Sequence, residues 1–467
     1  MLDPLDRHSR DSTLFQFTTK RLRDFIDPNH LLIQIDEQFD FQKLVEPLEE
    51  YYCRDNGRPA IHPEVLVRAL LISSLYNVSS FRRLCAAISE NLAFRRFCFL
   101  TIDDDVFHHS TISYFIERVG NEGFGQIFQR FNEELLRLGL LSRQVYADSS
   151  LVRANVSSSW LSPSGMSVEE FKEKAVEENG LFVLREQKAD EDGEEQESVS
   201  YYQDPKGRLP LNPVDTDARW RTTRKHDTKW KLHYQENVIV ERGGFIVART
   251  ATHASVGEWK AVDGMLKQLP VKPETFAADA AYRAGHLRKQ LDDMGIVAYI
   301  PFHPNQLRNM VAKGGFDYRG DHLVCPEGKV LRRSALLKQD RTYQYVARQH
   351  DCQRCPIKTE CLPPGQMRRY VALSIYHSLH LEAKERNEGE AYRTEMLRRK
   401  TIAEGVFASQ DRLGWARSRL RGLWKVDCEG YISSLAHNLK KAVRRLGNST
   451  SPPKPASAPA CVAVMTG

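Results

Sequence analysis

The first 140 residues carry apolar side chains at the spacing of helices. Behind Pro63, which can occupy a first helical turn, the stretch from Val65 to Leu75 is strongly apolar. The segment FGQIFQRFNEELLRLG (124–139) places apolar residues three or four positions apart and ends on Gly139, a residue type that often stops helices. This pattern predicts an all-α N-terminal domain over residues 1–140.

Basic residues are spread among these short helices, and two interpretations of them stay open. They could belong to a helix-turn-helix that reads DNA, or to a bundle that packs or dimerises, because the segment carries no sharp signature of either. The residues concerned are Arg82, Arg83, Arg95, Arg96 and Arg118.

From residue 143 onward the chain shows the signals of strands. RQVYAD (143–148) and PETFAAD (273–279) are short strand-like runs, each closed by an aspartate. Between them, two runs rich in β-formers, 230–241 and 244–253, are split at Arg242-Gly243-Gly244, which predicts a hairpin. A helix signal, AGHLRKQLDDMG, and a last strand signal, IVAYIPF, follow. This order predicts a fold of the mixed α/β (α+β) class, with a mixed sheet flanked by helices.

Two polar segments interrupt this core. Residues 157–220 are Ser-rich and acidic, with 12 Asp and Glu against 4 Lys and Arg over 169–197, and we expect a flexible insertion there. A second interruption, 305–380, precedes a late helix. The core is thereby divided into residues 141–304 and 381–446, and it is followed by a tail, 447–467, that we expect to be disordered.

Four of the nine cysteines lie within 37 positions of the second interruption. Cys352 and Cys355 form a CxxC knuckle, and Cys325 and Cys361 can complete a tetrahedral thiolate site. The match to a zinc ribbon is imperfect, because five residues separate Cys355 from Cys361 where a second CxxC would be expected. The alternative is a set of reduced thiols without a metal. We expect a structural Zn²⁺ that folds a small insertion with little apolar core of its own.

Charge and composition suggest a partner and a compartment. The net charge is only +6, yet residues 393–445 hold 13 Lys and Arg against 5 Asp and Glu. This imbalance suggests a polyanion such as DNA, with a solvated helix surface as the other interpretation. The sequence contains no run of 18 apolar residues, so we expect no membrane span. The segment MLDPLDRHSRDS lacks the apolar centre of a signal peptide. Together with the unevenly spaced cysteines, this predicts a cytoplasmic protein without a membrane partner.

Three acidic residues far apart in the sequence stand where metal ligands would. Asp148 ends VYAD, Asp279 ends FAAD, and Glu404 lies in the helix-like segment RRKTIAEGVFASQ. Carboxylates from two strand ends and one late helix can converge on a pair of divalent metals, and such hard ligands suit Mg²⁺ or Mn²⁺. For a single aspartate after a strand, a turn or helix-cap role is the alternative.

The order of these segments resembles that of DDE transposases of bacterial insertion sequences. It is similar to the group with a helical N-terminal domain, a ribonuclease-H-like core and a cysteine-bearing insertion before the final Glu. The resemblance covers roughly residues 25–445. The segments that carry it are GRPAIHPEVLVRALL (57–71), VYADSSLVRANVS (145–157), AADAAYRAG (277–285), the four-cysteine segment, AEGVFASQDRLGWARSRLRGLWKV (403–426) and SLAHNLKKAVRRL (434–446).

The resemblance implies a ribonuclease-H-like catalytic core with a zinc-ribbon-like insertion. It implies that Asp148, Asp279 and Glu404 are the catalytic triad, and that two Mg²⁺ or Mn²⁺ ions support cleavage at the element's ends and transfer of the 3′-OH to target DNA. The partners it implies are double-stranded DNA, as element ends and as target, and a second copy of the chain in a homodimer.

The chain departs from the family near Glu404. Phe407 is followed by Ala408 instead of Gly, Asp411 stands where a Lys is common, and Leu397 and Lys400 replace the familiar Tyr and Arg. Contacts to DNA ends must then come from other bases. The candidates are Arg398, Arg399, Lys400, Arg412, Arg417, Arg419 and Arg421.

Two rival functions remain open at this point. A metal-dependent nuclease on the same fold would cut DNA without joining it, and the same three carboxylates would serve both reactions. A DNA-binding protein without catalysis would keep the core only as a scaffold, although the intact Asp, Asp, Glu set argues against it.

Overall fold

The computed structural model describes residues 21–53, 59–156, 168–179, 181–189, 195–203, 209–222, 230–302, 315–338 and 341–449. The chain divides into two compact units, Met1–Val119 with Ile432–Gly467, and Gly120–Tyr431. The boundaries fall inside two long helices, α6 (His109–Arg137) and α15 (Leu423–Ser449). Gly120, at the first boundary, has a φ of 60° and interrupts α6, because this left-handed conformation does not fit a helix.

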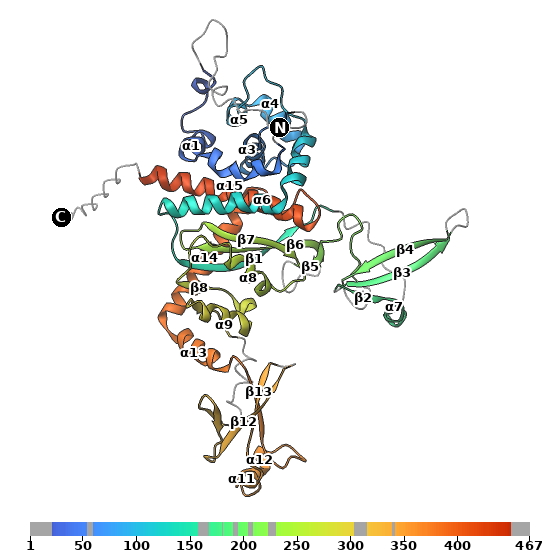
Figure 1. Cartoon of the computed structure of the whole chain (residues 1–467), viewed down its shortest axis with the longest axis vertical. Helices are drawn as coiled ribbons and strands as arrows, with labels where there is room; N and C mark the ends of the chain where they lie inside the picture. The colour runs from blue at the N-terminus through green and yellow to red at the C-terminus, as the bar shows by residue number, and fades with distance from the viewer. Residues whose placement is uncertain are drawn as a thin grey trace, which may run out of the picture. The chain divides into compact units, whose positions relative to one another are not determined.

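The described part of the first unit is helical, as the apolar spacing of the sequence predicts (Figure 1). Every residue of α3 is buried, so this helix forms the centre of the unit. The His62 side chain begins it by accepting a hydrogen bond from the Glu64 amide. The elements before α6 are η2 (Leu22–Phe25), α1 (Leu31–Gln38), α2 (Phe41–Val45), η3 (Glu46–Tyr51), α3 (Pro63–Leu75), α4 (Phe81–Glu90) and α5 (Leu92–Phe97).

Buried arginines hold these helices together. Arg68 donates to Asp36 at 2.8 Å and to Glu64 at 3.0 Å, and Arg96 donates to the second oxygen of Asp36 at 3.2 Å. Arg95 is buried as well and donates to the Thr101 carbonyl. The interpretation of Arg95 and Arg96 as DNA contacts is therefore wrong, because both guanidinium groups are committed to the core.

One mixed sheet forms the centre of the second unit. Strand β1 pairs antiparallel with β6 and parallel with β8, β6 pairs antiparallel with β7 and β5, and β8 pairs parallel with β9. The predicted hairpin is confirmed as β6 and β7, and Gly244 adopts a φ of 85° in the turn. The strands are β1 (Gln144–Arg153), β5 (Arg219–Arg221), β6 (Lys231–Glu241), β7 (Ile246–His253), β8 (Thr275–Ala277) and β9 (Val297–Tyr299).

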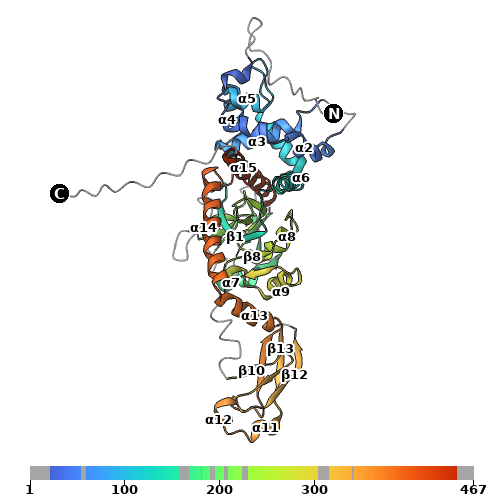
Figure 2. The same cartoon turned by 90° about the vertical axis from the view of Figure 1, so that its left-hand side faces the viewer.

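Helices cover both faces of this sheet, which confirms the predicted mixed sheet flanked by helices. Figure 2 shows α14 (Glu390–Arg412) along one face, with α8 (Val262–Leu266) and α9 (Gly285–Asp293) on the other. On the second face, apolar residues of β1, β7 and β8 pack against both helices. The short helices η5 (Glu258–Ala261) and η6 (Ala280–Tyr282) lie at the same end of the unit, and α13 (His377–Glu388) precedes α14.

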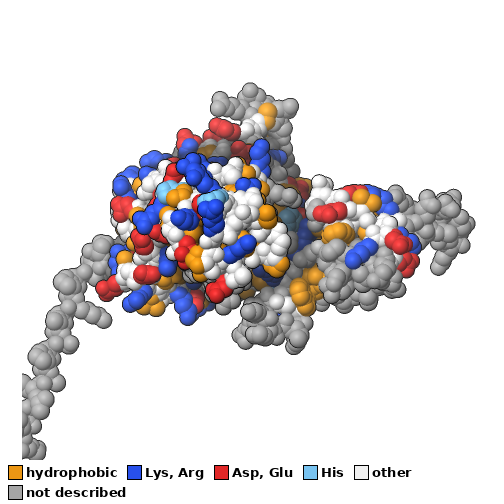
Figure 3. Space-filling view, turned by 90° about the horizontal axis from the view of Figure 1, so that it is seen from below, with side chains coloured by type: hydrophobic (Ala, Val, Ile, Leu, Met, Phe, Trp, Pro, Cys, Tyr) orange, Lys and Arg blue, Asp and Glu red, His pale blue; other side chains and the backbone are white. Residues whose placement is uncertain are grey.

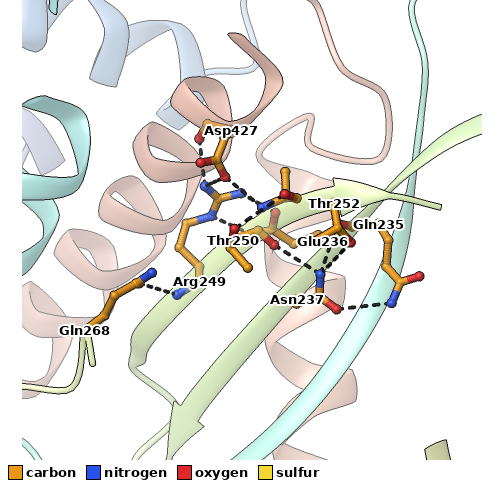
Figure 4. Close-up of polar contacts among 9 residues, drawn as sticks. Gln235, Glu236, Asn237, Arg249, Thr250, Thr252, Gln268 and Asp427 are labelled. Carbon is orange, nitrogen blue, oxygen red and sulfur yellow. Dashed lines mark hydrogen bonds and ion pairs between the residues drawn. The ribbon is translucent and has the colours of Figure 1, made fainter. Parts of the chain in front are cut away.

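A buried ion-pair network joins α15 to the sheet (Figure 4). The Arg249 guanidinium on β7 is fully buried, donates to Glu236 at 2.9 Å and donates to Asp427 of α15 at 2.6 Å. Asp427 also accepts the Ala251 amide at 2.7 Å. Since two carboxylates and backbone groups satisfy one guanidinium, the start of α15 is held in one register against β7.

The acidic segment 157–220 contains regular structure in its described residues. Strands β2 (Val176–Glu178), β3 (Leu181–Ala189) and β4 (Glu195–Tyr202) form an antiparallel sheet beside α7 (Val168–Lys174). The expectation of a flexible insertion is wrong for these residues. The high acidity of the segment outweighed its short runs of β-forming residues in the prediction. Two of these residues, Leu184 on β3 and Tyr202 on β4, are buried.

The cysteine-bearing interruption is larger than a zinc ribbon. It forms a five-stranded antiparallel sheet in chain order, with its own apolar cluster of Leu323, Leu331, Tyr345 and Leu373. The expectation of little apolar core is therefore wrong. The elements are β10 (Asp317–Tyr318), β11 (His322–Val324), β12 (Val330–Leu337), β13 (Thr342–Val346), α11 (Gln349–Gln353), α12 (Lys358–Cys361) and β14 (Tyr370–Ser374).

The face of the molecule seen from below is mixed in character. Figure 3 shows Lys and Arg side chains scattered among acidic, apolar and uncharged groups on the face seen from below. None of the helices in the described part of the chain is long and apolar enough to cross a membrane. The predicted disordered tail lies outside the described residues beyond Ser449.

Candidate active site

Asp148 and Asp279 occupy matching positions where two parallel strands separate. The last pair in the register of β1 with β8 is Tyr146 with Ala277, and each aspartate lies two residues beyond it. Adjacent strands are about 4.8 Å apart, so the two aspartates lie near each other, and the charge of Asp279 acts on Asp148. Asp148 lies in the middle of β1, not at its end as the sequence predicts, because SSLVR continues the antiparallel pairing with β6 to Arg153. The parallel pairing is what ends here.

Asp279 also begins a short helix. Its Oδ1 accepts the Ala281 amide at 2.8 Å as the N-cap of η6. The helix-cap interpretation of this aspartate therefore holds, and it is compatible with a ligand role because a carboxylate has two oxygens and about four acceptor sites.

Helix α14 is fastened to β1 by two polar contacts one turn apart. The Tyr146 hydroxyl donates to Glu395 at 2.7 Å, and the Arg399 guanidinium donates to Asp148 Oδ2 at 2.8 Å. Two residues along a strand span about 6.6 Å, and four along a helix span about 6 Å, so the two spacings match. This match places α14 alongside the strand that carries Asp148.

The environment of Asp148 raises the pKa of its carboxyl. Burial raises the pKa of the carboxyl above its ordinary value, and the charge of Asp279 raises it further. The Arg399 guanidinium and the Ser149 amide oppose this rise in pKa. Raised carboxylate pKa values of this kind occur where acidic groups are gathered for a positive ligand or for proton transfer.

A third carboxylate, which sequence reasoning missed, lies at the same place. Glu258 begins η5, which follows β7 and packs against η6, the short helix that Asp279 caps. Burial raises the pKa of Glu258, and the charges of Asp279 and Asp148 add to the rise. An acidic residue in a first helical turn is common, so the sequence carried no signal for this role.

A tyrosine from η6 completes this group. Tyr282 is fully buried, and its hydroxyl has no hydrogen-bond partner within the described structure. Burial raises the pKa of this phenol well above its ordinary value. The charges of Glu258, Asp148 and Asp279 raise it further.

Glu404 lies on α14, as the sequence predicts. Among the described residues, no contact links its side chain to Asp148 or Asp279. Its neighbours Ala403 and Val406 are buried, whereas Glu404 itself is exposed. It follows Arg399 by five residues, which turns it about 140° around a regular helix. The structure therefore brings Asp148 and Asp279 together and leaves Glu404 on the solvent side of α14.

The seven basic candidates near Glu404 fall into two groups. Arg399 binds Asp148, and Arg419 lies 3.6 Å from Glu429 with only 16% of its side chain exposed, so both have internal partners. Arg398 pairs with Glu395 at 2.6 Å. The remaining candidates present exposed cationic groups, and they are Lys400, Arg412, Arg417 and Arg421.

The four clustered cysteines approach one another without forming a metal site in the structure. Burial raises the pKa of the Cys361 thiol, and Cys352, Cys355 and Cys325 all add to the rise. The Cys325 sulfur accepts the Lys329 amide at 3.3 Å. Among the described residues, no three His, Cys, Asp or Glu side chains are gathered closely enough to hold a metal ion.

Two families of transposase domains match the sequence. The transposase domain DUF772 matches residues 20–118, and the transposase DDE domain matches residues 324–443. The chain is a DDE transposase. Both matches belong to transposases of the insertion-sequence type, and they establish a DNA transposase as its function. The second match contains α14 with Glu404, whereas Asp148 and Asp279 lie outside both matched ranges.

Other comparisons add little. No curated protein matches the transposase. Among solved structures, the piggyBac transposase synaptic complex with hairpin DNA, determined by cryo-EM, matches at 11% identity and a TM-score of 0.31, over 93% of this chain and 84% of that chain. At that TM-score the likeness carries no argument about fold or site.

Proposed function

We propose that the transposase cuts DNA at the ends of an insertion sequence and joins the freed 3′-OH to target DNA, at a metal-dependent site built on Asp148, Asp279 and Glu404. The observation that carries this proposal is the register of β1 and β8, which sets the two aspartates beside each other. Open sheets of this class place ligands at the carboxyl ends of parallel strands.

The sheet supports a ribonuclease-H-like core. Strands β7, β6 and β1 are antiparallel neighbours in that order, and β8 and β9 continue the sheet in parallel. In this arrangement the central strand, β1, carries the first carboxylate, and the next strand, β8, leads into the second.

The donor atoms fit Mg²⁺ or Mn²⁺. Asp148 and Asp279 offer hard oxygen ligands, and the buried hydroxyl of Tyr282, which has no hydrogen-bond partner among the described residues, supports a polar ligand near them. Two ions bound there would activate the attacking hydroxyl and stabilise the leaving oxygen. In the absence of DNA, Arg399 holds one oxygen of Asp148 and fixes the orientation of its carboxylate.

The role of Glu404 rests on the family resemblance of AEGVFASQDRLG and on its place in α14, the helix fastened to β1. Beside it, Lys400, Arg412, Arg417 and Arg421 would contact DNA phosphates, since all four are exposed cations. We further propose that the first unit contributes to DNA binding, through the exposed Arg82 and Arg83, and that two copies act as a homodimer on paired ends.

The cysteine cluster would hold a structural Zn²⁺. Cys325 and Cys352 pack against the same apolar cluster, and Cys355 and Cys361 lie just before α12 and at its end, which supports this proposal. Thiolates are the ligands that zinc prefers in structural sites. A zinc ion there would fasten α11 and α12 to the loop that follows β11.

The test is a cleavage assay on labelled DNA that carries the element's own ends, in Mg²⁺ or Mn²⁺. Glu404→Gln should abolish cleavage and leave end binding nearly intact, because it removes a ligand without changing the shape of α14. Glu390→Gln, an exposed change on the same helix, is the matched control and should cleave normally. Equal loss of binding and cleavage in Glu404→Gln would refute the catalytic assignment.

A further inference from the structure

The cysteine-bearing insertion between β9 and α13 is strongly basic. Its described residues, 315–338 and 341–374, hold 11 Lys and Arg against 5 Asp and Glu. This excess of six positive charges equals the net charge of the whole chain. Of these 11 bases, only Arg319 pairs with a carboxylate in the described structure, at 2.6 Å from Asp317. Most of the positive charge is therefore left without an acidic partner there, which favours binding of a polyanion.

The two faces of the insertion's sheet differ in burial. One face carries the apolar cluster described above, whose members are buried. Because side chains alternate along a strand, the residues next to these in sequence lie on the opposite face. The pairing registers place four of them in one row across β11 to β14, and they are His322, Arg332, Val346 and Tyr370. None of the four is buried, so this second face is accessible along the row.

The helices next to this sheet lie away from the row. In both views α11 and α12 lie at one end of the strands (Figures 1 and 2). The ring of His377, the first residue of α13, lies 4.6 Å from the ring of Tyr318. Tyr318 is paired with Leu323 of the apolar cluster and therefore belongs to the buried face. Within the described part of the chain, these helices leave the second face uncovered.

The groups on this face have the chemistry of phosphate contacts. Arg368, two residues before Tyr370 and on the same face, donates its Nε proton to the Tyr370 hydroxyl at 2.8 Å. The tyrosine proton and the other N–H groups of Arg368 remain for a further acceptor. Arg332 lies two strand spacings from Tyr370, which is about 10 Å. That span is too wide for one small anion and fits an extended row of phosphates.

We propose that this face of the insertion binds the phosphate backbone of duplex DNA through Arg332, Arg368 and the Tyr370 hydroxyl. Duplex DNA is the occupant because the chain is a DNA transposase and because separated cations match the regular charge of a duplex. The inference goes beyond the proposed function, since it uses neither the metal site nor the bases of α14.

Fluorescence anisotropy of the full chain with labelled duplex DNA from the element's end, without divalent metal, tests the proposal. Arg332→Ala and Arg368→Ala should each weaken binding about tenfold and reduce the slope of log affinity against log salt by about one. Tyr370→Phe should weaken binding about fivefold and leave the slope unchanged, because it removes a hydrogen bond and no charge.

Arg333→Ala is the matched control. It removes the same charge from the adjacent position of β12, which is paired with the buried Tyr345 on the other face, and should bind DNA as the wild type does. Equal losses in Arg332→Ala and Arg333→Ala would show that overall charge sets the affinity, and this would refute the inference.

The failure of this inference differs from that of the proposed function. If Arg332→Ala and Arg368→Ala, folded by circular dichroism, keep the affinity and salt slope of the wild type, the DNA-binding face is refuted. Metal-dependent cleavage by the wild type would still support the proposed function in that case. Because binding is measured without a metal, failure of the metal site would leave the expected losses unchanged.

Discussion

Arg399 donates a 2.8 Å hydrogen bond to Asp148, and so a helix cation occupies an oxygen of the carboxylate that is proposed to bind metal. The pair is mostly shielded from solvent, with 13% and 20% of the two side chains exposed. The arginine has two consequences for Asp148: it lowers a pKa that burial raises, and it competes with a metal cation for the same oxygen.

Arg399→Gln should therefore strengthen Mn²⁺ binding in the absence of DNA. A hydrogen bond to a charged group contributes about 1.5 kcal/mol, which corresponds to an affinity gain of up to roughly tenfold. Isothermal titration of the full chain with Mn²⁺ measures this, with Arg398→Gln as the control on the neighbouring position. An unchanged or weaker affinity would show that Arg399 does not compete for the site.

Arg249→Met should destabilise the second unit strongly. The change leaves the buried Glu236 and Asp427 without their cation, and breaking a buried pair in this way costs about 3–5 kcal/mol. Urea unfolding measures the loss. Arg143→Met is the matched control, since Arg143 lies 3.7 Å from Glu274 with both side chains mostly exposed, and it should cost less than about 1 kcal/mol. Equal losses would contradict the structural role of the network.

Gly430→Ala should disturb the same network from the side of α15. A Cβ at this position would lie 2.1 Å from an Arg249 nitrogen, so the guanidinium must leave its partners. Overpacking of this kind costs about 1–3 kcal/mol. Gly264→Ala in α8, where a Cβ would meet nothing within 4 Å, is the control and should be neutral or slightly stabilising. Thermal unfolding distinguishes the two variants.

The exposed bases on and after α14 should set the salt dependence of DNA binding. Lys400→Ala and Arg412→Ala should each weaken binding to any DNA sequence and reduce the slope of log affinity against log salt by about one. Arg419→Ala should instead lower stability, because Arg419 pairs with Glu429, whose side chain is only 11% exposed. Fluorescence anisotropy at several salt concentrations gives the slopes, and unchanged slopes for both exposed bases would remove them from the interface.

The cysteine cluster should contain zinc in the purified protein. We expect about one Zn²⁺ per chain by elemental analysis, and its loss in Cys352→Ser, because three remaining thiols complete a tetrahedral site poorly. Cys53→Ser, an exposed cysteine outside the cluster, should keep the metal. Wild-type protein that contains no zinc after purification without chelators would refute this site.

Local patterns predicted the elements well, because hydrophobic spacing reports burial directly. The helical first unit, the hairpin of β6 and β7, and the strand leading to Asp279 follow from such patterns. The segment 157–220 was misread because its acidity outweighed the short β-forming runs that pair as β3 and β4. The buried roles of Arg95 and Arg96 were likewise hidden, since a basic residue in a helix usually faces solvent.

Parts of the site depend on long-range register, which no local pattern encodes. Asp148 was found as the end of an apolar run, yet its position next to Asp279 comes from the pairing of β1 with β8. Glu258 carries no sequence signal, because it comes near the aspartates only through the packing of η5 against η6, whereas Tyr282 follows Asp279 by three residues. The exposed position of Glu404 follows from which face α14 turns to β1.

The most direct test of the account is a strand-transfer assay with pre-cut element ends that carry a free 3′-OH, a target plasmid and Mg²⁺. The account predicts joined products with the wild-type transposase, and none with Asp148→Asn, Asp279→Asn or Glu404→Gln, although each variant still binds the ends. Joining that persists in any of the three variants would contradict the assignment of that residue. End binding without joining by the wild-type protein, in either Mg²⁺ or Mn²⁺, would contradict the central claim.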